Sequence, residues 1–209
     1  MRRLIFAFLM ILAWPQCAVS QVPNGMYFAP KTNIEALDIA AIHQAGPGWT
    51  IAVAAYALTD KPLVAELIAR AQAGAQIQIY RDHMQVASEC RGDQKCPSAA
   101  WQQLVGLPGV EIKVKRSTML MHLKAYMVID PSGKSLLFRE GSANFSPAGE
   151  SHQDNSAFFS RDPDLIAEFK SVFLEMWSRP DNLSVADAVA SAPKWSSRRP
   201  PQNAPQKPS

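Results

Sequence analysis

The sequence predicts an α/β domain in which helices cover both faces of a mixed β-sheet. Stretches of strand length, either continuously apolar or alternating between apolar and polar residues, recur along the chain. Amphipathic stretches of helix length separate them. This alternation is typical of layered α/β domains, in which ligands gather at the ends of strands.

The first half of the chain has the clearest helix signals. Thr32 and Glu35 have the spacing of a capping box, which predicts a helix ending before Gly46. Asp60 is expected to cap a second helix that ends near Gly74. The predicted strands of this half are 51–55, by its unbroken apolarity, and 76–80, by its alternation.

The second half is predicted to contain one hairpin between further helices and strands. The run 125–129 is rich in β-branched and aromatic residues, and 130–134 has the composition of a turn. The other predicted elements are a short helix at 98–105, an alternating strand at 110–115, a strand at 156–160 and a helix from Asp162 to Trp177.

The N-terminus has the three parts of a secretory signal peptide. Arg2 and Arg3 precede an apolar run at 4–14, and small residues at 18–20 predict cleavage near Ser20. A retained membrane anchor is the alternative. We therefore expect residues 1–20 to be a signal peptide of a secreted or periplasmic protein, 21–180 to form one domain, and the Pro-rich segment 181–209 to be a disordered tail.

Cysteine content agrees with export. Cys90 and Cys96 remain after removal of the signal peptide and are expected to close a small disulfide loop. Two free thiols or a metal pair are the alternatives.

Charge gives only a local signal. The formal net charge of +3 includes the arginines of the signal peptide and several basic residues of the tail, so the domain itself is close to neutral. A strongly basic nucleic-acid-binding body is therefore not supported. Basic residues nevertheless concentrate near the hairpin and could attract a phosphate-bearing substrate: Lys113, Lys115, Arg116, Lys124, Lys134 and Arg139.

The hairpin is expected to assemble a phosphate-binding site. His122 and Lys124 are two residues apart, so in a strand they share a face. Folding back at the turn would bring Gly141, Ser142 and Asn144 beside His122. Imidazole, ammonium, hydroxyl and amide groups together are suited to holding and attacking a phosphate.

At these residues the chain resembles the HKD motif of the phospholipase D superfamily, in the order His122-x-Lys124, Asp130, Gly141-Ser142-x-Asn144. It is most similar to the single-motif members: small periplasmic endonucleases, secreted bacterial phospholipases and mitochondrial cardiolipin hydrolases. The resemblance runs from about Tyr27 to Trp177 and implies a phospholipase D-like layered sandwich. Two features depart from the pattern. The segments on both sides of Asp130 are longer than usual, and Asp154 or Asn155 stands where many relatives have a histidine-orienting glutamate.

The resemblance implies a catalytic set of His122, Lys124 and Asp130, without a metal or other cofactor. His122 would be the nucleophile that forms a phosphohistidine, and Lys124, Ser142 and Asn144 would bind the phosphoryl oxygens. The chemistry needs two such histidines, and the chain has one His-x-Lys pair. A homodimer with its active site at the interface would supply the second. Surface or capping roles are expected for His43, His83 and His152. A core position is expected for Tyr56, with a place in the lining of the pocket as the alternative.

We expect the protein to be a metal-independent phosphodiesterase. The favoured form is a nonspecific endonuclease that acts on DNA or RNA. A phospholipase D that hydrolyses phospholipid head groups is the alternative enzyme. A second alternative is a non-catalytic protein that binds phosphate-rich polymers or a secretion or conjugation partner.

Overall fold

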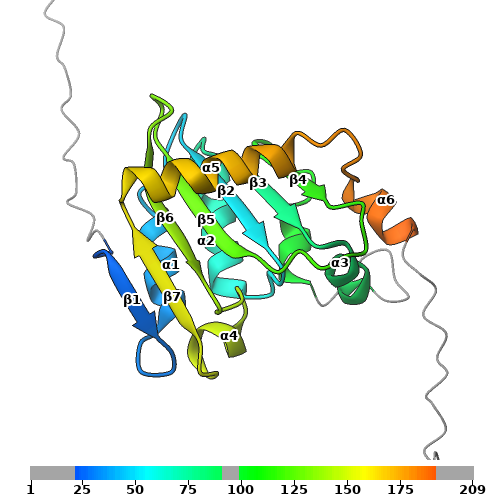
Figure 1. The fold of residues 1–209 in the computed structure, drawn as a ribbon. Helices are drawn as coiled ribbons and strands as arrows, with labels where there is room; N and C mark the ends of the chain where they lie inside the picture. The colour runs from blue at the N-terminus through cyan, green and yellow to red at the C-terminus, as the bar shows by residue number, and fades with distance from the viewer. Residues whose placement is uncertain (1–21, 91–98, 192–209) are drawn as a thin grey trace, which may run out of the picture.

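The computed structural model describes residues 22–90 and 99–191. In these residues a single seven-stranded sheet lies between two layers of helices (Figure 1). The strand order is β1-β7-β6-β5-β2-β3-β4. β2, β3 and β4 are parallel to one another, and all other neighbours are antiparallel. The predicted mixed sheet with helices on both faces is thus confirmed.

The strands are β1 (Gly25–Phe28), β2 (Thr50–Ala55), β3 (Gln76–Arg81), β4 (Val110–Val114), β5 (Lys124–Ile129), β6 (Ser135–Gly141) and β7 (Ser156–Ser160). The helices are α1 (Ile34–Ile42), α2 (Lys61–Gln72), α3 (His83–Glu89), the 3-10 helix η1 (Ala100–Leu104), α4 (Pro147–Ser151), α5 (Pro163–Trp177) and α6 (Val185–Ala190). Of these, α3, α4 and α6 were not predicted.

Side-chain caps fix where the helices begin. The Asp60 carboxylate accepts a hydrogen bond from the Leu63 amide at 2.8 Å, as predicted for the start of α2. At α1 the cap is Asn33, whose side chain accepts from the Ala36 amide at 3.1 Å. The capping box expected from Thr32 is therefore displaced by one residue.

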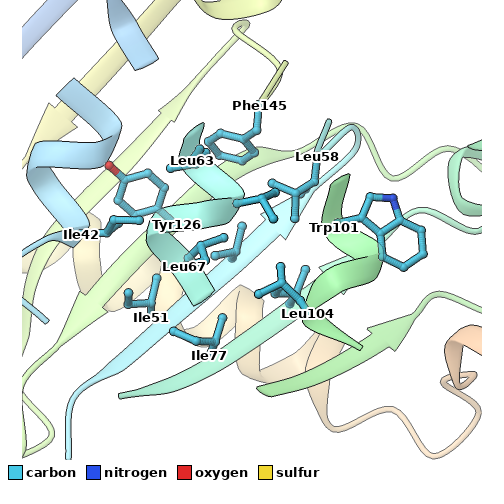
Figure 2. Packing of buried hydrophobic residues seen from close by; sticks show 14 of the residues in the cluster. Ile42, Ile51, Leu58, Leu63, Leu67, Ile77, Trp101, Leu104, Tyr126 and Phe145 are labelled. Carbon is cyan, nitrogen blue, oxygen red and sulfur yellow. The ribbon is translucent and has the colours of Figure 1, made fainter. Parts of the chain in front are cut away.

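Alternation along the strands divides the core between the two faces of the sheet. From β2, Ile51 and Val53 pack with α1, α2 and η1, whereas Ala52 and Ala54 pack with α5. Figure 1 shows α5 crossing the sheet alone on its face. Figure 2 shows the other face, where side chains of α2 and η1 meet the strands and two loop residues, Leu58 and Phe145.

The C-terminal segment extends the domain beyond its predicted end at residue 180. Leu183 pairs with Val114 of β4 in an antiparallel bridge, and Ala188 of α6 is fully buried. The predicted tail therefore starts too early, because 181–191 pack on the domain.

Several predictions fall outside the described residues. The signal peptide, Cys96 and the segment 192–209 are among them. Cys90 is buried at the end of α3, and its disulfide with Cys96 stays a prediction. Within 22–90 and 99–191 we find no helix long and apolar enough to cross a membrane.

Candidate active site

Three chain segments meet at one edge of the sheet, where β2 and β6 end and β5 begins. In the β2–β5 register Ala55 lies opposite Lys124, and the next amide, that of Tyr56, donates to the Leu123 carbonyl at 2.9 Å. One guanidinium nitrogen, Nη1 of Arg139, donates to the carbonyls of Lys124 (2.7 Å) and Ala143 (3.2 Å). The backbone beside His122 and the backbone beside Asn144 are therefore neighbours, as the hairpin predicted.

His122 is exposed immediately before β5. Its imidazole contacts the half-buried ring of Tyr56, with centroids 4.8 Å apart and planes at 64°. The sequence expectation that Tyr56 belongs to the core is corrected, because its ring orients against the histidine at the site.

Lys124 lies behind His122 and is only 3% exposed. Its Nζ donates to the His122 carbonyl at 2.7 Å and lies 5.1 Å from the centroid of the Tyr56 ring. Burial, with a smaller effect of the Arg139 cation, lowers the pKa of Lys124 to about 8. The ammonium retains further N–H groups that can be donated to an anion.

Asn144 and Ser142 follow β6. The Asn144 Oδ1 is buried and has no hydrogen-bond partner within the described chain, so this amide is not held by a protein partner at that atom. Ser142 is exposed, and its Oγ accepts from the Ser156 amide at 2.9 Å. The hydroxyl proton of Ser142 remains available for donation.

Two glycines allow this loop to pack. A Cβ on Gly141 would lie 2.2 Å from the Ser156 carbonyl oxygen, and one on Gly149 would lie 2.5 Å from the Asn144 carbonyl oxygen. Both positions require glycine because backbone approaches them too closely for any side chain. The glycine of the Gly-Ser-x-Asn motif thus serves the pairing of β6 with β7.

Asp130 does not belong to the site. It follows β5 in the turn to β6, at the end of the sheet opposite Lys124, since Thr50 pairs with Ile129 and Ala55 with Lys124. Its Oδ1 accepts hydrogen bonds from the Ser132 amide and hydroxyl and from the Lys134 amide. The hydrogen bond from the Ser132 hydroxyl is the main cause that lowers the pKa of Asp130. The expected catalytic role is corrected to that of a turn residue.

Neither expected histidine-orienting residue is joined to His122 by a hydrogen bond within the described part of the chain. The amide nitrogen of Asn155 donates to the Gly149 carbonyl at 3.0 Å and to Gln153 Oε1 at 3.2 Å. Asp154 is exposed in the same turn. Asn155 therefore fixes the end of α4 rather than the imidazole of its own chain.

The expected basic cluster is dispersed. Lys134 lies in the distant turn, Arg139 is fully buried, and Lys113 Nζ lies over the Trp177 ring and donates to the Trp177 carbonyl. Unlike these three residues, Lys124 lies at His122.

Arg139 was assigned to attracting substrate but is the buried centre of the site's support. Its Nη2 lies 3.1 Å from Asp38 Oδ2, both side chains being fully buried, and its guanidinium lies over the Phe145 ring at 4.5 Å. Asp38 also accepts from the Tyr126 hydroxyl at 2.9 Å. Burial raises the pKa of Asp38 even though Arg139 and Tyr126 oppose this rise.

A group of carboxyl side chains lies next to this pair. One oxygen from each of Glu35, Asp60 and Glu150 falls within 4.8 Å of the others. Burial raises the pKa of Glu150 to about 10, with the Asp38 carboxylate adding to the effect, and burial with a hydrogen bond to Asp60 raises the pKa of Glu35 to about 7. No sequence motif joins these residues, and only their capping positions, at Asp60 and in the first turns of α1 and α4, hinted at them.

The other histidines are engaged elsewhere. His43 pairs with Glu66 at 2.8 Å, and His152 Nδ1 lies 2.9 Å from the Pro147 carbonyl. His83 is buried, with its ring nitrogens 2.9 and 3.1 Å from the carbonyls of Arg116 and Ala188. His43 and His152 are C-cap residues, as expected, whereas the surface or capping role expected of His83 is corrected because its ring is buried.

Comparison with known proteins agrees with this fold. The family model for the cardiolipin synthase, PLD-like domain matches residues 39–177, more than half of the chain. The protein therefore belongs to this family, within the phospholipase D superfamily of phosphodiesterases.

Solved structures share the fold. NucT from Helicobacter pylori is 19% identical, with a TM-score of 0.58, and the alignment covers 74% of this chain and 95% of NucT. Nuc from Salmonella typhimurium, a phospholipase D family member, is 18% identical, with a TM-score of 0.59 and coverage of 77% and 97%. Phosphatidylserine synthase from Haemophilus influenzae is 12% identical, with a TM-score of 0.53 and coverage of 78% and 40%. No curated protein matches the sequence significantly.

Proposed function

We propose that the protein is a metal-independent endonuclease that cleaves DNA or RNA with little sequence preference, through a phosphohistidine at His122. The observation that carries the proposal is an exposed imidazole with a buried lysine directly behind it, next to the backbone of the loop that carries Asn144. Support for nucleic acid comes from the fold shared end to end with two small proteins, NucT and Nuc, of which 95% and 97% are covered.

In the proposed reaction an imidazole nitrogen of His122 attacks phosphorus, and the bond from phosphorus to the leaving oxygen breaks. The Lys124 ammonium and the Asn144 and Ser142 side chains donate to the phosphoryl oxygens as their charge changes. Water then attacks the phosphohistidine, which releases the second product and restores the imidazole.

The leaving oxygen needs a proton, and we propose that a second copy of the chain supplies it. His43, His83 and His152 are occupied by the contacts described above, so His122 of a twofold-related copy would act as the general acid. An active site shared across a homodimer interface follows from this proposal, as does export to the periplasm or the exterior from the N-terminal sequence pattern.

A phospholipase D activity is the second candidate, and one feature favours it. Met119 and Leu120 are 73% and 61% exposed, three and two residues before His122. Apolar side chains at the rim of the site could contact acyl chains, although they could equally cover the interface between two copies.

The substrate is tested by supplying double- and single-stranded DNA, RNA and phospholipid vesicles to the purified protein, with and without chelator. We expect cleavage of nucleic acid that survives chelation and is lost in His122→Ala and His122→Asn. Release of head groups without nuclease activity would establish the lipid candidate. A strict requirement for added Mg²⁺ or Zn²⁺ would overturn the metal-independent mechanism.

The dimer is tested by mixing equal amounts of wild type and His122→Ala under conditions of subunit exchange. If both histidines act in one site, heterodimers are inactive, and activity falls to about a quarter of that of undiluted wild type for random pairing of the two chains. Retention of half the activity, or a fully active monomer in sedimentation, would contradict the shared site.

A further inference from the structure

Three carboxyl side chains from separate elements converge behind the candidate active site. Glu35 lies in the first turn of α1, Asp60 is the N-cap of α2, and Glu150 lies in α4. One ligand oxygen from each lies within 4.8 Å of the other two. We refer to these three residues as the carboxylate cluster.

A second observation, independent of the proximity of the three groups, is that buried oxygens of the cluster receive no hydrogen bond from an N–H or hydroxyl donor. Glu150 is fully buried, and neither of its carboxylate oxygens accepts such a hydrogen bond in the described chain; its carboxyl group contacts that of Asp38. Asp60 is also fully buried. Its Oδ1 caps α2, and its Oδ2 accepts no hydrogen bond from an N–H or hydroxyl donor of the described chain; the group that contacts Asp60 here is the Glu35 carboxyl. Buried carboxylate oxygens are satisfied in native proteins by donors or by a cation.

Nearby positive charge is already committed. Arg139 is the cation that acts on Glu150, but its guanidinium is paired with Asp38 and donates to two backbone carbonyls. Together with Asp38, the cluster therefore presents four carboxyl groups around a single arginine.

We propose that the carboxylate cluster is a binding site for Ca²⁺. Oxygen ligands surround Ca²⁺ at about 2.3–2.6 Å, so two ligands on opposite sides of the ion are about 4.6–5.2 Å apart. The three oxygens of the cluster all lie within 4.8 Å of one another, so they can surround one Ca²⁺ without movement. Mg²⁺ holds oxygen at about 2.0–2.1 Å, which allows at most about 4.2 Å between opposite ligands, and it gives up its bound water reluctantly, so a buried site made of carboxylates favours Ca²⁺.

The ion reaches the cluster from the solvent side, where water supplies its remaining ligands. Glu35 is only partly buried, whereas Asp60 and Glu150 are inaccessible, so the ion enters past Glu35 and keeps water on that side. A bound ion ties α1, α2 and α4 together. Because α4 follows Asn144 directly, the ion stabilises the loop that carries this residue without taking part in the chemistry.

The experiment is a titration of CaCl₂ into full-length protein stripped with chelator, followed by calorimetry and thermal unfolding. At a hundredfold excess over the dissociation constant, we expect the melting temperature to rise by about 5–10 °C. MgCl₂ at the same concentration should give a smaller rise. Glu150→Gln, which keeps the shape of the side chain but cannot ionise when a cation binds, should lose both the binding heat and the rise.

Glu140→Gln is the matched control, because Glu140 is exposed on β6 and lies outside the cluster. It should respond to Ca²⁺ as the wild type does. If Glu150→Gln does not fold, Glu35→Gln decides, since this partly exposed residue can be neutralised without disturbing the core. No binding heat and no thermal shift in stripped wild type, or an undiminished response in the glutamine variants, would overturn the proposal.

Discussion

Replacement of Arg139 by methionine tests the buried support of the site. The substitution keeps an unbranched side chain but removes the partner of Asp38 at 3.1 Å and the donor to the Lys124 and Ala143 carbonyls. Removing one member of a fully buried ion pair typically costs about 3–5 kcal/mol, because the other charge is left uncompensated. We therefore expect the free energy of unfolding to fall by about that amount, a large share of the roughly 5–15 kcal/mol of a typical domain.

Urea unfolding without added cations measures this loss. The midpoint should fall while the m-value stays constant, since the surface exposed on unfolding is unchanged. Arg179→Met is the matched control. Arg179 forms an exposed pair with Glu175 at 3.2 Å, so its loss should cost less than about 0.5 kcal/mol.

Acidification and a double variant distinguish the effect of the uncompensated Asp38 charge from a simple loss of packing. Without Arg139 the already raised pKa of Asp38 rises further, so the variant binds a proton that the unfolded chain does not, and its stability deficit should shrink as the pH falls from neutral to about 5. The double variant Arg139→Met, Asp38→Asn should recover most of the loss. A deficit below about 1 kcal/mol, or one that neither acid nor the second substitution reduces, would refute the reasoning.

Further predictions concern charge, packing and redox state. The pKa of Lys124 is about 8, so its ammonium is charged below this pH and neutral above it. We therefore expect kcat/KM to fall as the pH rises through about 8. If the same alkaline fall occurs in Lys124→Arg, titration of the lysine is not its cause. Gly141→Ala should lower the free energy of unfolding in urea by about 1–3 kcal/mol, because its Cβ would overlap the first carbonyl of β7. Gly46→Ala is the control and should lose no stability, because the space around Gly46 is open. Equal losses in the two variants would contradict this explanation. Mass spectrometry of the exported, unreduced protein should show Cys90 and Cys96 joined, and two alkylatable thiols would disprove the disulfide.

The sequence predicted those parts of the structure that depend on local signals. The hairpin was predictable because the strand composition of 125–129 and the turn composition of 130–134 act over a few residues. The same hairpin brings the backbone of Lys124 next to that of Ala143, as expected. Its prediction did not need the positions of the helices.

The residues whose roles were predicted wrongly are those whose surroundings depend on the packing of distant elements. Asp130 looked catalytic because it stands in the place of the aspartate of the HKD motif, but β5 carries it to the opposite end of the sheet. Arg139 looked like a surface cation, yet pairing with Asp38 of α1 buries it. The sequence alone does not distinguish a basic residue that faces water from one that pairs with a carboxylate of a distant helix.

Long-range convergence also explains what the sequence did not predict. The carboxylate cluster joins residues more than a hundred positions apart, and their meeting depends on how α1, α2 and α4 pack. The short helix α6 was included in the predicted tail because the segment beyond residue 180 is rich in Pro, Ser and Ala, and it packs through the bridge from Leu183 to Val114 and the burial of Ala188. Short elements of this kind derive their stability from tertiary contacts rather than from propensity.

The central claim is that His122 forms a covalent bond to phosphorus. Rapid mixing with a labelled oligonucleotide, an alkaline quench and intact-mass analysis should reveal a protein carrying one nucleotide fragment, and peptide mapping should locate it on His122. His122→Asn should show no adduct. Turnover without any adduct under these conditions, or an adduct on a different residue, would contradict the account.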